Sequence, residues 1–585
     1  MSALVQTRRI RWWFWCSLVV VLTLWFGLRW FGWLPLAAAA QPVPHPIEAD
    51  LLLHTARIWT GDAAQPEAEA IVAWQGRILF IGSSADAKAR FRAKRVIDAQ
   101  GRRVVPGFHD SHVHFLGGGM GLAQVQLKDA ADEAEFGKRL QLFDRQLPKA
   151  RWLLGGNWDH DRTFKGVLPT AALLDKYVKD RPVFLRRYDG HMALANSAAL
   201  KLAGITAQTP DPNGGEIVRL PGGKEPSGVL RDTAMGLVQQ VISRSDSDQQ
   251  EAWDALKAAL QTAREMGVTS VDDMAGGSSQ DQARLLRMYQ LLLDQRQLTC
   301  RINLYWPLGL WQDWSSRGVM AHFGNDYLRI GGLKGYADGS LGASTAKMFK
   351  PYLHEPHQLG VWVTPPGAMK GLIQEADQAG LAICVHAIGD EANAVMLDIF
   401  ADAAKNPRNP PRRYRIEHAQ ILRREDYPRF KAAGVIASMQ PYHIIDDGRW
   451  AEGRIGKERC QSSYACRSLL DAGAMLAFGS DWPVAPLSPI LGIDAAVRRR
   501  TLDGLHPEGW FPEQSITVAE ALRAYTFGSA FAAGQEHIKG QLKVGYLADL
   551  VMLDRDLLDA QARSQLDTIK VLLTIVGGEV VYERQ

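Results

Sequence analysis

The chain has 585 residues, of which 46% are hydrophobic and 22% charged, and its formal net charge is +4. This is the composition of an ordinary globular protein, and it excludes a disordered chain and a protein built to bind nucleic acid. A chain of this length exceeds one compact core, so we expect two or three structural units, the largest with room for a barrel of about 250 residues or more.

The first 40 residues have the pattern of a signal peptide or membrane anchor. Arg8, Arg9 and Arg11 precede an uncharged apolar run over residues 12–28, and a second apolar stretch follows Arg29. At about 1.5 Å per residue the first run falls slightly short of a hydrocarbon core of about 30 Å, so cleavage and retention both stay open. We expect an exported protein, periplasmic or otherwise extracytoplasmic, which is anchored in the inner membrane if the segment is retained.

Short strands and turns dominate residues 48–106, and a second β-rich stretch covers residues 536–585. Neither stretch shows long helical periodicity. The two stretches together predict a small β-sandwich-like domain that is built from both ends of the chain.

Between these ends, apolar runs of strand length alternate with amphipathic helical stretches over residues 107–535. That alternation is typical of an α/β fold with a parallel sheet and crossover helices. Eight such runs predict a (β/α)8 barrel of the TIM type, whose active site lies at the carboxyl ends of the strands. Residues of about 129–250 exceed one crossover and predict an inserted lobe. The predicted strands are 111–115, 268–274, 301–306, 329–335, 382–388, 414–420, 435–440 and 475–481.

The five cysteines do not form a disulfide framework, and no Cys-x-x-Cys pair is present to hold zinc. Cys16 lies inside the first apolar segment. Cys460 and Cys466 are close enough in sequence to pair across a short loop, and two unpaired thiols are the alternative.

A pair of histidines marks the first predicted strand of the barrel. His112 and His114 are separated by one residue, so on a strand both imidazoles point to the same face and can bind one ion. A pair of this kind arises by accident in a chain with 15 histidines. The surrounding segment VVPGFHDSHVH, at 104–114, is much more specific.

Further ligand types follow at the ends of later predicted strands. His386, His418 and Asp481 each end an apolar run, where the chemistry of a barrel is located. A lone buried histidine is usually a core residue that has found a hydrogen-bond partner. Four histidines and an aspartate at strand ends instead indicate a metal site.

These residues and several longer segments resemble the amidohydrolase superfamily, and in particular its YtcJ-like branch, which includes enzymes similar to N-substituted formamide deformylase. The likeness runs from about residue 50 to the C-terminus. The segments that carry it are KGYADGSLG at 334–342, DGHMALANSAAL at 189–200, GVLR at 228–231 and KVGYLADL at 543–550.

The resemblance implies one or two divalent metal ions. His112, His114 and Asp481 would bind the first ion, and His386 and His418 the second. Because an ammonium group cannot ligate a cation, the resemblance also implies that Lys334 is carboxylated on its side-chain nitrogen and bridges the two ions; a surface or salt-bridged lysine is the alternative. Zinc is the ion we expect, although iron, manganese or cobalt suits the same ligands.

The resemblance further implies how such a site works. A bound ion lowers the pKa of its water from 15.7 to about 7 and polarises the carbonyl of the substrate. Asp481 would take the proton of that water and deliver it to the leaving nitrogen, so it is both a ligand and a catalytic residue.

The inserted lobe and the segment after the seventh predicted strand, which contains Gln440 and His443, supply the remaining candidates. His191 is expected to hydrogen-bond the substrate or the oxyanion that forms from it, with fixation of the loop as the alternative role. Trp158, Asn196 and Gln440 are the candidate substrate-binding residues, and a structural role is the alternative for them too. His443 could line the pocket or be a plain loop residue.

The sequence therefore predicts a metal-dependent hydrolase that cleaves a non-peptide carbon–nitrogen bond in an amide, N-formyl or cyclic amide group of a small molecule. Two alternatives stay open: hydrolysis of an ester, lactone or carbamate at the same site, and a catalytically silent, membrane-tethered binding protein. No nucleic-acid partner is expected. A homodimer is one of the oligomeric states left open.

Overall fold

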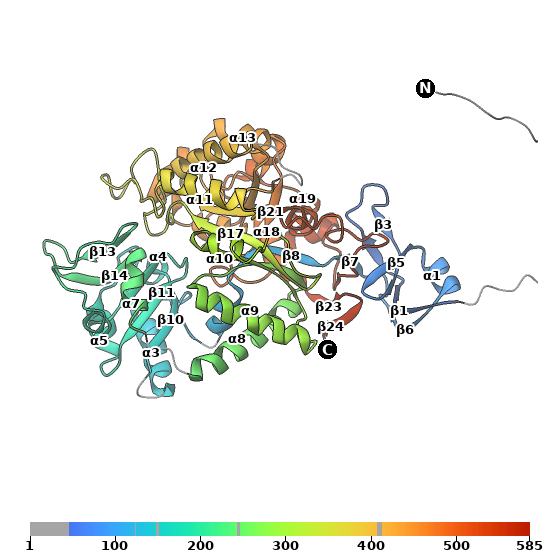
Figure 1. Ribbon diagram of the computed structural model, residues 1–585, viewed down its shortest axis with the longest axis horizontal. Helices are drawn as coiled ribbons and strands as arrows, with labels where there is room; N and C mark the ends of the chain where they lie inside the picture. The colour runs from blue at the N-terminus through green and yellow to red at the C-terminus, as the bar shows by residue number, and fades with distance from the viewer. Residues whose placement is uncertain (1–45, 123, 148–150, 243–245, 406–411) are drawn as a thin grey trace, which may run out of the picture. The chain divides into compact units, whose positions relative to one another are not determined.

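The computed structural model describes residues 46–122, 124–147, 151–242, 246–405 and 412–585 (Figure 1). The predicted export segment, residues 1–40, lies outside the described residues. Among the described residues, none of the helices combines the length and the apolar character that a membrane crossing requires.

Eight parallel strands form the central sheet, and the barrel-type α/β fold expected from the eight apolar runs is confirmed. The order of the strands is that of the chain, and Val113 and Trp482 join the first and last of them through an isolated parallel bridge. These strands are buried almost throughout, as expected for a parallel sheet covered by helices. They are β8 (Phe108–Val113), β15 (Val268–Met274), β16 (Arg301–Pro307), β17 (Leu328–Tyr336), β18 (Ile383–Ala387), β19 (Arg415–His418), β20 (Ile436–Met439) and β21 (Leu476–Phe478).

Amphipathic helices connect these strands and cover the sheet. Helix α9 shows how the sequence starts one of them: Ser278 accepts a hydrogen bond from the backbone of Asp281, whose carboxylate accepts one from the backbone of Ser278 in return. The longer helices are α2 (Phe115–Leu122), α8 (Asp246–Glu265), α9 (Ser279–Asp294), α11 (Pro366–Gln378), α12 (Asp390–Ala403), α13 (Tyr427–Ala433) and α18 (Pro489–Arg498). Shorter ones include α10 (Trp311–Ser315), α14 (Tyr442–Asp447), α15 (Ala451–Ile455), α16 (Lys457–Cys460), α17 (Cys466–Asp471), α19 (Val518–Arg523) and α20 (Ser529–Ala532).

The inserted segment folds as a lobe around its own six-stranded sheet. Alternate residues of β11 enter two different cores: Val183 and Leu185 pack on one face of the sheet and Phe184 on the other. The strands are β9 (Val125–Gln126), β10 (Leu153–Trp158), β11 (Val183–Arg187), β12 (Met192–Ala195), β13 (Gly215–Arg219) and β14 (Pro226–Asp232). The helices are α3 (Glu133–Gln146), α4 (His160–Thr163), α5 (Ala171–Tyr177), α6 (Ser197–Leu202) and α7 (Gly236–Gln239).

Segments from both ends of the chain meet in a second six-stranded sheet, next to a four-stranded one. One core contains Leu51 and Ile71 from the four-stranded sheet and Leu550 and Leu573 from the other. The four-stranded sheet contains β1 (Ile47–His54), β4 (Ala70–Trp74), β5 (Arg77–Gly82) and β6 (Phe91–Asp98), and α1 (Ser84–Arg90) precedes β6. The six-stranded sheet contains β2 (Arg57–Trp59), β3 (Glu67–Ala68), β7 (Arg103–Pro106), β22 (Leu550–Leu553), β23 (Val571–Val576) and β24 (Glu579–Glu583).

Among the described residues, four cysteines are buried free thiols, and Cys460 and Cys466 are two of them. The alternative in which these two pair is not realised. Cys384, on β18, lies in a small core with Met274 and Tyr305.

Candidate metal centre and its pocket

The carboxyl ends of five barrel strands bring the predicted ligands into one region. His112 lies on β8 with His114 directly after it, while Lys334, His386 and His418 lie at or near the ends of β17, β18 and β19. Asp481 follows β21 at a backbone φ of +60°, and its amide donates a 2.7 Å hydrogen bond to the carbonyl of His112. This bond holds the two ends of the barrel together at the site.

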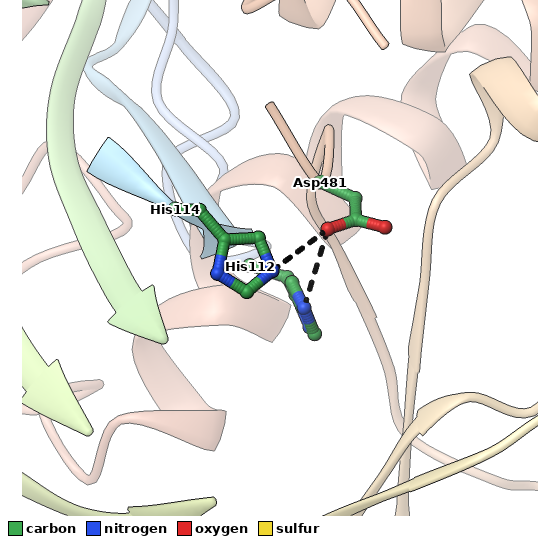
Figure 2. Close-up of side chains that lie close together, drawn as sticks. All are labelled: His112, His114 and Asp481. Carbon is green, nitrogen blue, oxygen red and sulfur yellow. Dashed lines mark ion pairs between the residues drawn. The ribbon is translucent and has the colours of Figure 1, made fainter. Parts of the chain in front are cut away.

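Two imidazoles and one carboxylate face each other at the centre of this region. Oδ1 of Asp481 lies 3.5 Å from Nε2 of His112 and 3.3 Å from Nε2 of His114 (Figure 2). Ligand atoms from these three residues all lie within 4.8 Å of one another.

Hydrogen bonds on the far side of each ring orient these imidazoles. Nδ1 of His112 lies 2.6 Å from Oε2 of Glu417, and Nδ1 of His114 lies 2.8 Å from the carbonyl of Met274. Both partners accept, so each Nδ1 carries the proton and each Nε2 presents a lone pair to Asp481. Burial lowers the pKa of His112 well below its ordinary value, which keeps its ring neutral.

This donor set fits a divalent cation. Oδ1 of Asp481 is buried and accepts no hydrogen bond from the described residues. A carboxylate oxygen that faces two imidazole lone pairs is repelled by both unless a cation lies between them. The ligand types and their convergence are those of a zinc-type site.

A second group of candidate ligands adjoins the first. His418 and His443 lie with Asp481 in another set of ligand atoms within 4.8 Å of one another. The ring of His386 is 4.5 Å from that of His418, centroid to centroid. Nε2 of His386 donates to the carbonyl of Gly339 at 2.9 Å, so Nδ1 is the nitrogen that remains for a ligand.

Lys334 lies inside this cluster and not on the surface. Its Nζ is 3.3 Å from Nε2 of His112 and 4.8 Å from the centre of the Tyr336 ring, and the residue is 2% exposed. Burial lowers the pKa of its ammonium group.

The lobe contributes His191 to the same region. Its ring centroid is 4.9 Å from that of His386, and its Nδ1 lies 2.6 Å from Oδ1 of Asp232 on β14. Burial by itself would lower the pKa of His191, but the hydrogen bond and the charge of Asp232 raise it above its ordinary value. The predicted lobe histidine therefore does face the barrel site.

The three predicted substrate-binding residues are not among those that line the pocket over this site. The indole of Trp158 is buried in the lobe and donates to the carbonyl of Leu185. Asn196 caps α6 and bonds to the backbone of β11 and its flank. Gln440 is buried next to the end of β20, with its amide 3.2 Å from the carbonyl of Ser438. The sequence segments that contain Trp158 and Asn196 build the frame of the lobe.

The pocket over this site is narrow and partly open to solvent. Its lining joins His386, His418 and Asp481 to residues that the sequence did not single out, including Tyr188, Asp447 and Trp450. The dense polar stretch around Tyr188 was a signal that could have identified one of them. No local pattern distinguishes Trp450, because the lobe reaches it only in the folded chain.

Comparison with known proteins places most of the chain in one family. The model of the Amidohydrolase family matches residues 95–582. Protein LONG AFTER FAR-RED 3 of Arabidopsis thaliana is 37% identical over 92% of this chain and 92% of its own length. The putative amidohydrolase YtcJ of Bacillus subtilis is 31% identical over 88% of this chain and 96% of its own length. The N-substituted formamide deformylase of Arthrobacter pascens is 28% identical over 92% of this chain and 98% of its own length.

A solved structure agrees with these relatives. An uncharacterised metal-dependent hydrolase from Pyrococcus horikoshii superposes with a TM-score of 0.70 at 29% identity, over 88% of this chain and 99% of the other. The similarity thus covers the lobe and the end sheets as well as the barrel.

Proposed function

The chain belongs to the amidohydrolase family, in the branch of YtcJ and N-substituted formamide deformylase, and on that premise we propose that it hydrolyses a non-peptide carbon–nitrogen bond of a small molecule. The bond proposed is that of an amide, an N-formyl group or a cyclic amide. The observation that carries the proposal is the buried Oδ1 of Asp481, which faces Nε2 of both His112 and His114 and has no donor among the described residues.

Two sets of residues would hold the ions. His112, His114 and Asp481 form the first set, and His386 and His418 with a carboxylated Lys334 form the second. Zinc is the proposed ion, since neutral imidazoles with carboxylate-type oxygens suit it. When bound, such an ion supplies Lewis-acid polarisation of the carbonyl oxygen and makes water more acidic.

The chain's own groups would move the proton and hold the substrate. Asp481 lies where it can take the proton of an attacking water and pass it to the nitrogen that leaves. His191, oriented by Asp232, can donate a hydrogen bond from Nε2 to the oxygen that becomes negative when water adds to the carbonyl.

Carboxylation of Lys334 is part of the proposal. The reaction joins the side-chain nitrogen to the carbon of carbon dioxide and releases one proton from the nitrogen, so it requires the neutral amine. Burial, which lowers the pKa of Lys334, favours that form. Carbon-13 NMR of the protein equilibrated with labelled bicarbonate would show a carbamate signal that is absent in Lys334→Met.

Metal analysis together with a substrate screen tests the function. The purified protein should hold one or two equivalents of metal and hydrolyse members of a panel of formamides, acylated amines, cyclic amides and lactones. His112→Ala should lose metal and activity, whereas Asp481→Asn should lose most of its activity. Turnover of lactones alone would assign the protein to the ester hydrolases instead. A wild type that holds no metal and has the same activity as both variants would contradict the proposal.

We also propose that the protein is exported, on the strength of the arginines at the start of the chain and the apolar runs that follow them. Fractionation of cells that produce the full chain, followed by terminal sequencing, would test this. A cytoplasmic product with an intact N-terminus would contradict it.

A further inference from the structure

Two residues that line the pocket carry buried hydrogen-bond donors for which the described residues offer no acceptor. The phenol oxygen of Tyr188 and the indole nitrogen of Trp450 are both buried, and neither makes a hydrogen bond with any of the described residues. Tyr188 directly follows β11 of the lobe, and Trp450 lies between α14 and α15 of the barrel. Both residues line the same pocket as His386, His418 and Asp481.

The guanidinium group of Arg187 connects the two donors. Its central carbon lies 4.5 Å from the centre of the Tyr188 ring and 5.9 Å from that of Trp450. Nη1 of Arg187 is 2.8 Å from Oδ2 of Asp189, yet it makes no directed hydrogen bond, so this contact is an ion pair only. Three groups that can donate hydrogen bonds therefore gather on one side of the pocket.

The surrounding contacts hold both rings in place. Nζ of Lys128 lies 4.3 Å from the centre of the Tyr188 ring, and the backbone amide of Tyr188 donates to the carbonyl of Trp158 at 3.2 Å. The backbone amide of Trp450 donates to Asp447 at 2.9 Å, and the guanidinium of Arg454 lies 5.6 Å from its ring. Because the rings are fixed, the donors keep their positions.

Buried donors that lack an acceptor among the described residues call for a partner of another kind. A buried polar group without a partner costs about 1–3 kcal/mol, and nearly all such groups in folded proteins are paired. The acceptor is then water or a bound molecule. Since this pocket also contains the proposed metal ligands, a bound molecule that reaches these donors would be the substrate.

The local charges favour a neutral acceptor. Arg187 is already paired with Asp161 at 3.0 Å and with Asp189 at 2.8 Å, so little of its positive charge is left for a carboxylate. Asp447 lines the same pocket and is hydrogen-bonded by Gln420 and Tyr464. Next to Tyr188 and Trp450, the carboxylates of Asp161 and Asp189 therefore offset the charge of Arg187, which favours a neutral acceptor over an anionic one.

We propose that Tyr188 and Trp450 form a subsite that donates hydrogen bonds to a neutral carbonyl group of the substrate. This carbonyl is a different one from the carbonyl that is hydrolysed. This inference rests on the proposed hydrolase function. It narrows the substrate class to molecules with a second, uncleaved amide, urea or ester carbonyl, and it makes the lobe a determinant of specificity, because Tyr188 reaches the pocket only from there.

Turnover of matched probes tests the subsite. The probes are N-alkylformamides with chains of two to five methylenes and the same compounds with a terminal primary amide or a terminal carboxylate. At the best chain length, the wild type should prefer the amide to the alkyl compound by about tenfold or more in kcat/KM, which corresponds to one hydrogen bond of about 1.4 kcal/mol. Tyr188→Phe should abolish most of that preference, so that its kcat/KM for the amide compound falls to nearly that for the alkyl compound.

Matched variants separate this effect from general damage. Tyr177→Phe alters a tyrosine elsewhere in the lobe, and Trp74→Phe alters an exposed indole on β4. Both should keep the wild-type preference. Trp450→Phe should lose it as Tyr188→Phe does, and thermal melting identifies a variant that has merely unfolded.

Calorimetry keeps the result independent of turnover. Asp481→Asn should bind the amide probe more tightly than the alkyl probe, and the added Tyr188→Phe substitution should remove the difference. If the wild type hydrolyses neither these probes nor any compound of the panel described above, but this binding preference is found, the proposed reaction fails and the subsite stands. Equal binding of the probes, no binding of either, or a preference for the carboxylate would overturn the subsite.

Discussion

Nδ1 of His112 lies 2.6 Å from Oε2 of Glu417, the residue directly before His418 on β19. Neighbouring residues of one strand thus serve the same centre in different ways: His418 faces the candidate ligands, and Glu417 orients a histidine of β8 from behind. Glu417 is itself held by Arg415, whose Nε lies 2.8 Å from Oε1. The orientation of His112 is therefore built into the barrel wall.

Weakening this contact should weaken metal binding. Glu417→Gln keeps the shape of the side chain but removes its negative charge, so the imidazole of His112 becomes a poorer ligand. The affinity for zinc should fall by about 10–100-fold, measured by competition with a chromogenic chelator. Glu425→Gln, at an exposed position, is the control and should bind zinc as the wild type does. Equal affinities in both variants would refute the role of Glu417.

The contact between His191 and Asp232 should matter for turnover and not for metal content. His191→Ala and Asp232→Asn should each lower kcat/KM by about 10–100-fold while the bound metal stays at the wild-type amount, because a single donor to the developing oxyanion is lost or misdirected. The double variant should be no worse than His191→Ala. Additive losses, or loss of metal in either variant, would count against the assignment.

Gly342, in the loop after β17, packs closely against Arg187 of the lobe, so we expect that a larger residue at this position destabilises the protein. A Cβ at Gly342 would lie 2.4 Å from Nη1 of Arg187, which its ion pairs hold in place. Gly342→Ala should lower the free energy of unfolding by about 1–3 kcal/mol in urea titrations and reduce kcat/KM. Gly371→Ala, in α11 with open space around it, should raise stability by about 0.5–1 kcal/mol. A stable and fully active Gly342→Ala protein would show that Arg187 can shift freely.

A buried lysine next to β15, Lys539, predicts a pH dependence of stability. Lys539 is 4% exposed, donates to Oγ of Ser270 at 2.9 Å, and has its pKa lowered by burial to about 7. In the unfolded chain the pKa of lysine is about 10.4. Between these values the unfolded chain holds a proton that the folded chain lacks, so this residue makes the free energy of unfolding rise with pH.

Lys539→Met should remove that contribution. Urea unfolding at about pH 7 and about pH 9 should show a smaller gain in stability at the higher pH for this variant than for the wild type. Lys88→Met, at an exposed position on α1, is the control and should follow the wild type. An unchanged pH dependence in Lys539→Met would mean that the lysine is charged when folded.

The barrel and the types of its ligands could be predicted from the sequence, because both depend on local patterns. A buried parallel strand is a short apolar run, and a ligand at its carboxyl end is the polar residue that terminates the run, as at His386, His418 and Asp481. The family resemblance, and not the local pattern, identified Lys334 as a further candidate ligand and the YtcJ-like branch of the family. The predicted roles of these residues stay predictions until metal and activity are measured.

Only the tertiary structure decided which polar residues face the pocket. Trp158 and Asn196 stand in polar, motif-rich segments, yet the fold uses their side chains to bond the backbone of the lobe. Tyr188 and Trp450 are more than 250 residues apart in sequence and share a pocket because the lobe packs over the barrel. The periodicity of a strand or helix predicts which face of that element is buried. The wall of a pocket depends on contacts between elements that are distant in sequence, and no local pattern encodes those contacts.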